Sequence, residues 1–456
     1  MPSEVTTNLQ DQLEEIVGAG HLDWQPETLA AFGVDGVMPI LVVHPGTQEE
    51  VSKVVAACAA TGTPMLPWGG GTAVGQGNAP SAAPVVIGLD RLDRVVEFDP
   101  ENLCVTVEAG MPLARLQGLV ATKQELLPLD PPEAERATLG GLVAADQSGP
   151  SRLLHGTARD WVLGLRVVLP DGERIRCGGR VIKNVSGYDM NKLFIRSFGT
   201  LGIITEVTVK LLPIPEARGT VLGVFQELRQ AAEVVEQVLG SFLLPEALEL
   251  LDPTARKRLP TELVLGSPEA FLLAVGMAGS QASVDRQIRD LKALVEAGGG
   301  QAICLREAAS SDAWKAITNV LRPSVPEPEG TICRLSVPIG RTACMMAAIR
   351  QRAASHSLTA AVAAHAGSGL LRVTLGPLPS LPAERGSEAL VAAIESLRKE
   401  VEEIGGSLIL EEASMAIKQR VDAWGALRSD FGIMKRIKGE FDPLGLFSPG
   451  RFVGRL

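Results

Sequence analysis

Apolar runs and stretches of helical spacing alternate along most of the chain. Apolar residues from Leu9 to Val17 recur every three or four positions and predict a short leading helix. Thr47, followed three residues later by Glu50, is a capping-box signature for the start of a second helix. Up to residue 215, the pattern further predicts strands at 38–43, 85–87, 95–98 and 105–107, a helix at 113–120, a hairpin of 162–169 with 174–177, and a buried strand that ends at 211.

Beyond Pro213 and Pro215, which mark a boundary, the alternation continues to about residue 410. This region predicts an α+β arrangement with a layer of helices on one antiparallel sheet. A further helix is expected over 421–436, followed by a Pro/Gly-rich tail that ends at Arg451 and docks back onto the body. The expected strands are 221–225, 271–277, 302–305, 332–337 and 371–375, and the expected helices are 227–241, 281–297, 340–354 and 384–403.

Glycine-rich stretches punctuate the first half of the chain at 69–77, 140–149 and 199–202. Consecutive glycines accept positive φ angles, and their N–H groups can form a concave site for a phosphate. No P-loop sequence occurs, and the GxGxxG spacing is not met near a helix start. Glycine loops that converge on one long ligand favour a dinucleotide bound in an extended conformation. The alternative is that they are plain surface turns.

Composition narrows the possible functions. The 456 residues are 46% apolar with a net charge of −10, which is typical of a soluble protein of two or more domains. The absence of a basic tract argues against nucleic acid as a partner. No signal peptide and no run of about 18 apolar residues is present, so we expect a cytoplasmic protein without a transmembrane segment. The six cysteines form no CxxC pair, which argues against an iron–sulfur cluster in this chain.

Several of these stretches together resemble a known family. The three glycine stretches, residues 129–131 and His155–Asp160 are similar to the PCMH-type FAD-binding domain of the vanillyl-alcohol oxidase superfamily. Val181–Met190 and Phe441–Val453 resemble the flavin subunits of glycolate oxidase (glycolate dehydrogenase). The resemblance implies an N-terminal helical segment (1–36), a two-subdomain FAD-binding domain (37–215), a ferredoxin-like α+β cap with an antiparallel sheet (216–420), and a C-terminal helix and tail (421–456) that returns to the FAD domain.

The resemblance implies FAD as the cofactor, and we expect it to be non-covalent because residues 67–80 contain no His or Cys. Backbone N–H groups of residues 69–73 would hold the pyrophosphate, residues 138–149 would line the flavin, and Ile203 would meet the adenine end. The cofactor-binding residues carried over are Gly69, Gly70, Gly71, Thr72, Ala73, Gly77, Asn78, Asp130, Pro131, Thr138, Gly140, Gly141, Ala144, Gly149, Gly202 and Ile203.

The stretch from His365 to Arg372 departs from the family pattern. Catalytic relatives carry a His-x-Gly-Asp-Gly-Asn-x-His motif whose histidines bind a divalent metal. Here Ser368, Leu370 and Arg372 replace the Asp, the Asn and the second His, and a guanidinium would repel a cation. A later Glu-His-Gly motif lacks its histidine. We therefore predict no metal site, and a closer resemblance to the second flavin subunit of glycolate oxidase than to its catalytic flavin subunit.

His365 and Arg372 are the candidate catalytic residues. His365 either accepts a proton from the substrate or is a buried structural histidine. Arg372 either clamps a substrate carboxylate or pairs with Glu411 or Glu412. Four other residues have less specific expectations. His155 is expected to order the 149–160 loop, and Arg451 is expected either to reach FAD or to dock the tail. The roles of Lys183 and Tyr188 stay open.

The resemblance implies an FAD-dependent oxidoreductase that serves as the flavoprotein subunit of a glycolate, D-lactate or other 2-hydroxyacid dehydrogenase complex. Its electrons would pass to an iron–sulfur or quinone-linked partner. The implied partners are a catalytic flavin subunit and an iron–sulfur subunit, and any membrane association would be peripheral and through them. The alternatives are a self-sufficient FAD-dependent 2-hydroxyacid dehydrogenase and a non-catalytic FAD-binding scaffold for a catalytic flavin subunit.

Overall fold

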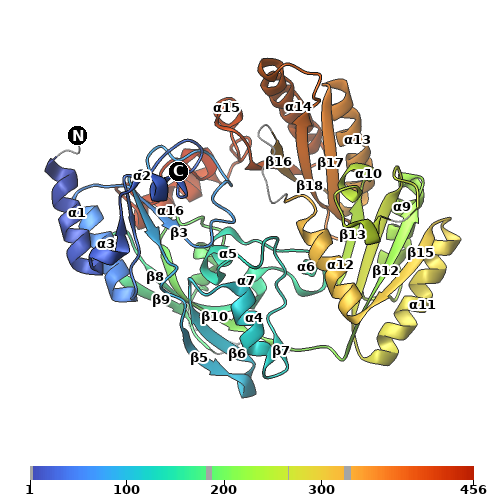
Figure 1. Ribbon diagram of the computed structural model, residues 1–456, viewed down its shortest axis with the longest axis horizontal. Coiled ribbons are helices and arrows are strands. Elements are labelled where there is room, and N and C mark those ends of the chain that lie inside the picture. The colour runs from blue at the N-terminus through green and yellow to red at the C-terminus, as the bar shows by residue number, and fades with distance from the viewer. Residues whose placement is uncertain (1–3, 181–186, 265, 323–329) are drawn as a thin grey trace.

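The computed structural model describes residues 4–180, 187–264, 266–322 and 330–456. Lys183 and most of the Val181–Met190 motif therefore lie outside the described residues. Figure 1 shows an N-terminal region, coloured from blue to green, beside a cap region, coloured from yellow-green to dark orange, with the red C-terminal segment packed on the N-terminal region. We use the names N-terminal region for residues 4–213 and cap for residues 217–412.

The N-terminal region begins with a sheet of order β1-β2-β4-β3, in which β2, β4 and β3 are parallel and β1 is antiparallel. Helices α1 and α3 pack against this sheet, and their apolar stripes meet its buried valines and leucines. At the start of α3, Thr47 Oγ1 accepts the N–H of Glu50 at 3.1 Å, as the capping signature predicted. The bounds are α1 Glu4–Val17, β1 Leu22–Asp23, α2 Pro26–Ala30, β2 Leu41–Val43, α3 Gln48–Ala60, β3 Met65–Trp68 and β4 Val85–Gly88.

An antiparallel sheet of order β5-β6-β10-β8-β9 follows, and it contains the predicted hairpin as β8 and β9. Its buried side chains pack against α4 and α5. A short pair, β7 with β11, leads to the cap. The bounds are β5 Val95–Asp99, β6 Cys104–Glu108, α4 Leu113–Ala121, β7 Glu125–Leu126, α5 Leu139–Ala145, α6 Arg152–His155, α7 Ala158–Trp161, β8 Val162–Val168, β9 Arg174–Gly178, α8 Asn191–Phe194, β10 Ile203–Lys210 and β11 Leu212–Pro213.

The cap is a single antiparallel sheet of order β15-β12-β14-β13-β17-β18-β16-β19 in the described part of the chain. Each half of this order follows a β-α-β-β-α-β path, so the predicted ferredoxin-like unit is present in duplicate, joined edge to edge at β13 and β17. The bounds are β12 Ala217–Phe225, α9 Leu228–Leu239, β13 Ala247–Leu251, α10 Pro253–Arg256, β14 Phe271–Gly279, α11 Gln281–Ala297, β15 Gln301–Arg306, α12 Glu307–Asn319, β16 Thr331–Ser336, α13 Thr342–Ser355, β17 Leu358–His365, β18 Leu370–Pro377, α14 Ala383–Glu403 and β19 Ser407–Glu412.

The two faces of the cap sheet differ in what covers them. Helices α9, α11, α13 and α14 bury one face in a continuous apolar core. On the other face, α12 covers β12 and β15, and α10 covers parts of β13, β14 and β17. Because side chains alternate along a strand, the remaining part of that face presents residues such as Glu249 and Arg334, whose neighbours in sequence lie in the helix-side core.

The C-terminal segment returns to the N-terminal region, as predicted, but its helix was placed wrongly. The helix expected over 421–436 is instead α16, Phe431–Phe441, after the short α15, Met415–Lys418. Gly425 has a φ of +89°, and the Oδ1 of Asp422 accepts the N–H of Trp424 at 2.8 Å, so this stretch turns. Beyond α16, residues 446–448 lie along β3, with Met65 N–H donating to Leu446 O at 2.8 Å and Ser448 N–H to Met65 O at 2.9 Å.

Candidate functional site

A cleft opens where β3 ends and the chain enters the glycine-rich loop. Its walls come from the loop itself, from α5, from the turn before β10 and from the C-terminal segment. The lining residues are Leu66, Pro67, Trp68, Gly69, Gly70, Gly71, Thr72, Ala73, Val74, Leu89, Gly140, Gly141, Ala144, Ala145, Phe198, Gly199, Gly202, Ile204 and Arg451.

The glycine loop offers backbone donors to this cleft. Within the described residues, the N–H groups of Gly69 through Ala73 donate no hydrogen bond to protein. Five successive free N–H groups form the kind of concave donor surface that binds a phosphate. The loop can pack this closely against neighbouring backbone because its glycines lack side chains. A Cβ on Gly70 would stand 1.8 Å from the carbonyl oxygen of Arg136, and Gly71 has a φ of +73°.

Most of the residues predicted to bind the cofactor line this cleft, namely Gly69 to Ala73, Gly140, Gly141, Ala144 and Gly202. Ile203 does not. Its side chain is fully buried in the core beneath β3 and β4, and Ile204 faces the cleft, because successive side chains of β10 point to opposite faces. Phe198 and Gly199 also line the cleft and were not predicted as site residues.

Gly77 and Asn78 hold the C-terminal segment rather than line the cleft. The Nδ2 of Asn78 donates to Asp422 Oδ2 at 3.0 Å, and its Oδ1 accepts the N–H of Ala423 at 2.8 Å. A Cβ on Gly77 would lie 2.6 Å from the carbonyl oxygen of Arg451. The polar groups of the Asn78 side chain are therefore used within the protein, and its assignment to the cofactor site stays a prediction.

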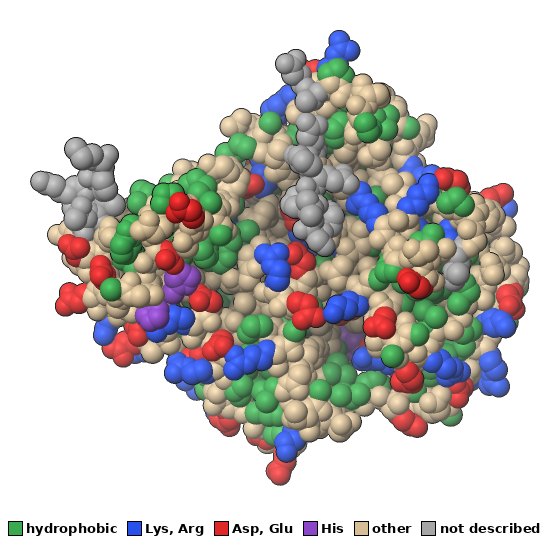
Figure 2. Space-filling model, in the orientation of Figure 1, with side chains coloured by type: hydrophobic (Ala, Val, Ile, Leu, Met, Phe, Trp, Pro, Cys, Tyr) green, Lys and Arg blue, Asp and Glu red, His purple; other side chains and the backbone are tan. Residues whose placement is uncertain are grey.

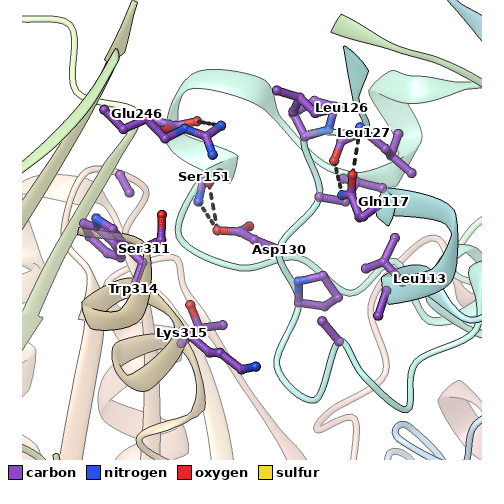
Figure 3. A pocket seen from close by; sticks show the side chains of 18 of the residues that line it. Leu113, Gln117, Leu126, Leu127, Asp130, Ser151, Glu246, Ser311, Trp314 and Lys315 are labelled. Atoms are coloured by element: carbon purple, nitrogen blue, oxygen red, sulfur yellow. Dashed lines mark hydrogen bonds and ion pairs between the residues drawn. The ribbon is translucent and has the colours of Figure 1, made fainter. Parts of the chain in front are cut away.

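Asp130 and Pro131 line a different cavity, of about 470 Å³, between the N-terminal region and the cap. In Figure 3, the carboxylate of Asp130 points to Ser151, with Trp314 and Lys315 of α12 on the facing wall. Ser151 donates to Asp130 from its N–H at 3.0 Å and from its hydroxyl at 2.7 Å. Burial raises the pKa of Asp130 to about 6 despite these bonds.

Three other residues singled out from the sequence, Thr138, Gly149 and His155, contact protein groups next to the cleft and the cavity. Thr138 Oγ1 accepts the N–H of Gly141 at 3.4 Å at the start of α5. Gly149 packs on Asp130, because a Cβ there would lie 1.8 Å from the Asp130 carbonyl oxygen. His155 Nε2 contacts Glu246 Oε1 at 3.3 Å, and its carbonyl accepts the Trp161 indole N–H at 2.7 Å, which holds the 149–160 loop as expected. Tyr188 is 95% exposed.

A small polar pocket adjoins the cleft and shares Ala145 with it. Side chains from the open part of the cap sheet form one wall, and residues after α5 form the other. The pocket is lined by Gln76, Ala145, Gln147, Ser148, Arg152, Arg334, His365, Leu370, Leu371, Arg372 and Glu411. In Figure 2, basic and acidic side chains both stand around the hollow between the N-terminal region and the cap.

His365 and Glu249 form a cross-strand pair at the junction of the duplicated units. The two residues are register partners on β17 and β13, and His365 Nδ1 contacts Glu249 Oε1 in a short hydrogen bond. Burial raises the pKa of Glu249, and His365 and Arg372 oppose that effect. The pair fixes the orientation of the imidazole and occupies Nδ1, so Nε2 is the ring nitrogen left to contact a ligand.

Arginine side chains surround a single buried carboxylate in this pocket. Arg372 Nε donates to Glu411 Oε2 at 2.8 Å, so Arg372 pairs with Glu411, one of the alternatives predicted for it. Arg334, the register partner of Arg372, and Arg322 approach the same carboxylate at 3.5 and 3.6 Å. Glu411 occupies a β-bulge of β19, because Ile332 pairs with Glu412 and Cys333 with Leu410.

The electrostatics of the cluster follow from burial and crowding. Burial by itself raises the pKa of Glu411, but Arg372, Arg322 and Arg334 more than offset it and leave the pKa at about 2. Burial lowers the pKa of Arg334 to about 10, and nearby arginines add to that effect. Arg152 donates to Ser148 Oγ at 2.9 Å and has no carboxylate within 4 Å among the described residues. The pocket thus favours an anion.

Sequence reasoning missed Arg152, Arg334 and Glu249. A signal existed for two of them, because a charged residue interrupts each of the apolar strands Cys333-Arg334-Leu335 and Leu248-Glu249-Leu250. A charge inside a buried strand is rare unless it is paired or faces a site. Arg152 gives no such signal, since it begins the short helix α6 and does not interrupt an apolar strand.

Among the described residues, no group of three or more His, Cys, Asp or Glu side chains is placed to hold a metal ion. In the same part of the chain, no helix has the length and apolar character needed to cross a membrane.

Comparison with known proteins identifies the family. Residues 39–178 match the FAD binding domain model, and residues 214–452 match the model of the C-terminal domain of FAD linked oxidases. The chain is 27% identical to glycolate oxidase subunit GlcD of Bacillus subtilis, over 99% of this chain and 98% of that protein. It is 30% identical to an uncharacterised FAD-linked oxidoreductase of Mycobacterium tuberculosis, over 91% of each.

Further similar proteins support the same family. A mitochondrial D-lactate dehydrogenase (cytochrome) of Arabidopsis thaliana is 28% identical over 99% of this chain and 79% of that protein. The solved structure of p-cresol methylhydroxylase superposes with a TM-score of 0.79 at 16% identity, over 99% of this chain and 97% of that one, which shows the shared fold. These findings confirm the predicted PCMH-type family, FAD as the cofactor and an oxidoreductase. The chain belongs to the FAD-linked oxidases.

Proposed function

We propose that this protein oxidises a small 2-hydroxy acid, with the FAD cleft and the adjoining arginine-rich pocket as its active site. The observation that carries the proposal is the juxtaposition of Arg152, Arg334 and His365 in one pocket that borders the cleft, with Glu249 holding the His365 ring. Relatives named as glycolate oxidase subunit, D-lactate dehydrogenase and D-2-hydroxyglutarate dehydrogenase support this substrate class.

The residues of the glycine loop would hold the FAD pyrophosphate through the free N–H groups of residues 69–73, and Gly140, Gly141 and Ala144 would lie along the flavin. FAD, when bound, supplies a two-electron oxidant for the substrate carbon. We propose that it is held without a covalent bond, because no His or Cys lines the described cleft.

The pocket residues would bind the acid and take up its hydroxyl proton. A guanidinium is suited to a carboxylate because it offers parallel N–H donors, and Arg152 is free of competing carboxylates among the residues described. With the Nδ1 proton of His365 donated to Glu249, the lone pair stays on Nε2, which accepts the proton. Arg372, held by Glu411, supplies positive charge to the pocket.

The finer proposal is that the chain works as the second flavoprotein of a glycolate or D-lactate dehydrogenase complex. The exchange of the family's second metal-motif histidine for Arg372 supports a division of labour with a catalytic flavin subunit that keeps the motif. The cysteines also support a separate iron–sulfur subunit, since the described ones are single, four of them buried and none in a disulfide.

The test uses the purified chain alone. Its visible flavin band is recorded, and then glycolate, D-lactate, L-lactate or the deoxy acids acetate and propionate are added without oxygen. Loss of the band with a 2-hydroxy acid, and not with the deoxy acid, supports the proposed chemistry; loss without any partner present overturns the dependence on a complex. No loss with any of the acids, alone or with a catalytic flavin subunit and an iron–sulfur subunit added, overturns the proposed substrate class.

A matched variant tests the carboxylate contact. Arg152→Gln is expected to raise KM for the active acid about 10- to 100-fold, the usual value of a hydrogen bond to a charged group, with FAD content unchanged. Arg341→Gln, an exposed arginine of the cap, is the control and should keep the wild-type KM.

A further inference from the structure

The side chain of Arg451 is buried against the FAD cleft with part of its guanidinium unused. Arg451 is 4% exposed and lines the cleft. Its Nη2 donates to the carbonyl oxygens of Val74 at 2.6 Å and Gln76 at 2.7 Å. Its Nη1 has no hydrogen-bond partner, and no carboxylate lies within 4 Å of the guanidinium in the described part of the chain. A buried cation without an anion is costly, so the site calls for an anionic ligand atom.

The cleft supplies a place for that anion. The five free N–H groups of residues 69–73 lie in the same cleft that the Arg451 side chain lines, and Arg451 Nη1 is the buried nitrogen left without a partner among the described residues. Backbone donors on one wall and a guanidinium on another are the partners that a pyrophosphate requires. The isoalloxazine ring, by contrast, needs the flat, small-residue wall provided by Gly140, Gly141 and Ala144.

The same region ties the C-terminal segment to the glycine loop. Lys418 Nζ donates to the carbonyl oxygen of Gly75 at 2.6 Å and pairs with Asp35 at 2.7 Å. Three consecutive loop carbonyls, of Val74, Gly75 and Gln76, thus point to cations that follow residue 412 in the chain. The position of the loop therefore depends on the docking of that segment.

We propose that Arg451 donates from Nη1 to the FAD pyrophosphate, and that FAD binding and docking of residues 442–452 stabilise each other. An anion held between the loop and Arg451 is bound only when both are in place. By linkage, the docked segment then raises FAD affinity by the same factor by which FAD stabilises the docked segment. The proposal rests on FAD binding alone and does not depend on the 2-hydroxyacid substrate.

The first test measures ligand affinity of the full-length apoprotein by flavin fluorescence and calorimetry. Arg451→Gln is expected to raise the Kd of FAD about 10- to 100-fold and to raise that of ADP similarly, while riboflavin, which lacks phosphate, keeps its Kd within about twofold. Arg451→Lys, which keeps the charge but not the forked donors, should fall between. Arg455→Gln, an exposed arginine just beyond residue 452, is the control and should match the wild type.

Two results would overturn the proposal. One is an unchanged FAD Kd in Arg451→Gln. The other is an equal loss for riboflavin and FAD, which would show that Arg451 acts on the flavin ring or only through the fold. The Arg451→Lys protein and a thermal melt of each apoprotein keep the comparison valid if Arg451→Gln folds poorly.

The second test follows limited proteolysis within residues 442–452. ADP is expected to slow cleavage several-fold in the wild type and in Arg455→Gln, and to have no such effect in Arg451→Gln. Equal protection of all these proteins by ADP contradicts the coupling between the pyrophosphate and the C-terminal segment.

Discussion

Removing the buried carboxylate of Glu411 is the sharpest test of how the arginine-rich pocket is held together. Glu411 is 1% exposed and faces Arg322, Arg334 and Arg372. Glu411→Gln keeps the side-chain shape but leaves these guanidinium groups buried together without a countercharge. Breaking a buried ion pair in this way typically costs about 3–5 kcal/mol.

The pKa of Glu411 gives a second, independent magnitude. It falls from an ordinary 4.5 to about 2 in the folded protein, and at about 1.4 kcal/mol per pH unit this corresponds to about 3 kcal/mol of stability at neutral pH. Because the folded pKa is the lower one, this stability is present above pH 4.5 and is lost as the pH falls through about 2. Both routes therefore predict a loss of about 3 kcal/mol for Glu411→Gln at pH 7.

The assay is urea unfolding of the holoprotein at fixed, excess FAD, so that ligand binding adds the same term to each variant. Glu412→Gln is the matched control, since Glu412 also contacts Arg322 but its side chain is 39% exposed, and it should cost about 1 kcal/mol or less. The deficit of Glu411→Gln should shrink by about 1 kcal/mol between pH 7 and pH 4. A cost no greater than that of Glu412→Gln, or a deficit that does not change with pH, would refute the reasoning.

Three further predictions concern the cleft and its neighbours. Gly70→Ala should purify with less than about a tenth of the wild-type FAD, because its Cβ would lie 1.8 Å from the carbonyl oxygen of Arg136. Gly118→Ala is the control and should keep its FAD, because open space surrounds its Cβ. Equal flavin absorbance of the two purified variants contradicts this prediction. Glu249→Gln should slow anaerobic flavin reduction by a 2-hydroxy acid about 10- to 100-fold with FAD content retained, because the negative charge beside His365 Nδ1 is lost. An unchanged rate in stopped flow speaks against it. The pKa of Asp130 is raised from 3.8 to about 6, so the stability of the wild type should fall by up to about 3 kcal/mol as the pH rises through this interval. Asp130→Asn should not show this fall. Equal changes in unfolding free energy between pH 4.5 and pH 7 for the wild type and the variant, measured in urea, contradict the prediction.

Much of the fold could be predicted from local pattern. The capped start of α3 and the β8–β9 hairpin follow signals contained within a few residues. β17 gives no such signal, because Leu358–His365 is rich in alanine, which favours helices. It is a strand because β13 and β18 pair with it on both sides and the helix layer covers it, so tertiary pairing outweighs propensity.

The candidate site likewise has one part that the sequence could predict and one part that it could not. The glycine loop was predictable because its conformation and its donors belong to one short segment. The arginine-rich pocket was not, since Arg152 lies on α6, Arg334 and Arg372 on adjacent cap strands, and Glu411 at a bulge. Only the order of strands in the cap sheet brings them together. Ile203 and Ile204 show the remaining limit, because a one-residue choice of face on β10 needs the register.

The pairing of β3 with residues 446–448 has a consequence for biosynthesis. Chains leave the ribosome N-terminus first, so β3 is made long before its neighbour at Phe447. Until residue 448 has emerged, that edge of the first sheet is an unpaired strand of the kind that other chains can join. The nascent protein therefore passes through a stage in which both its cofactor loop and a sheet edge are unfinished.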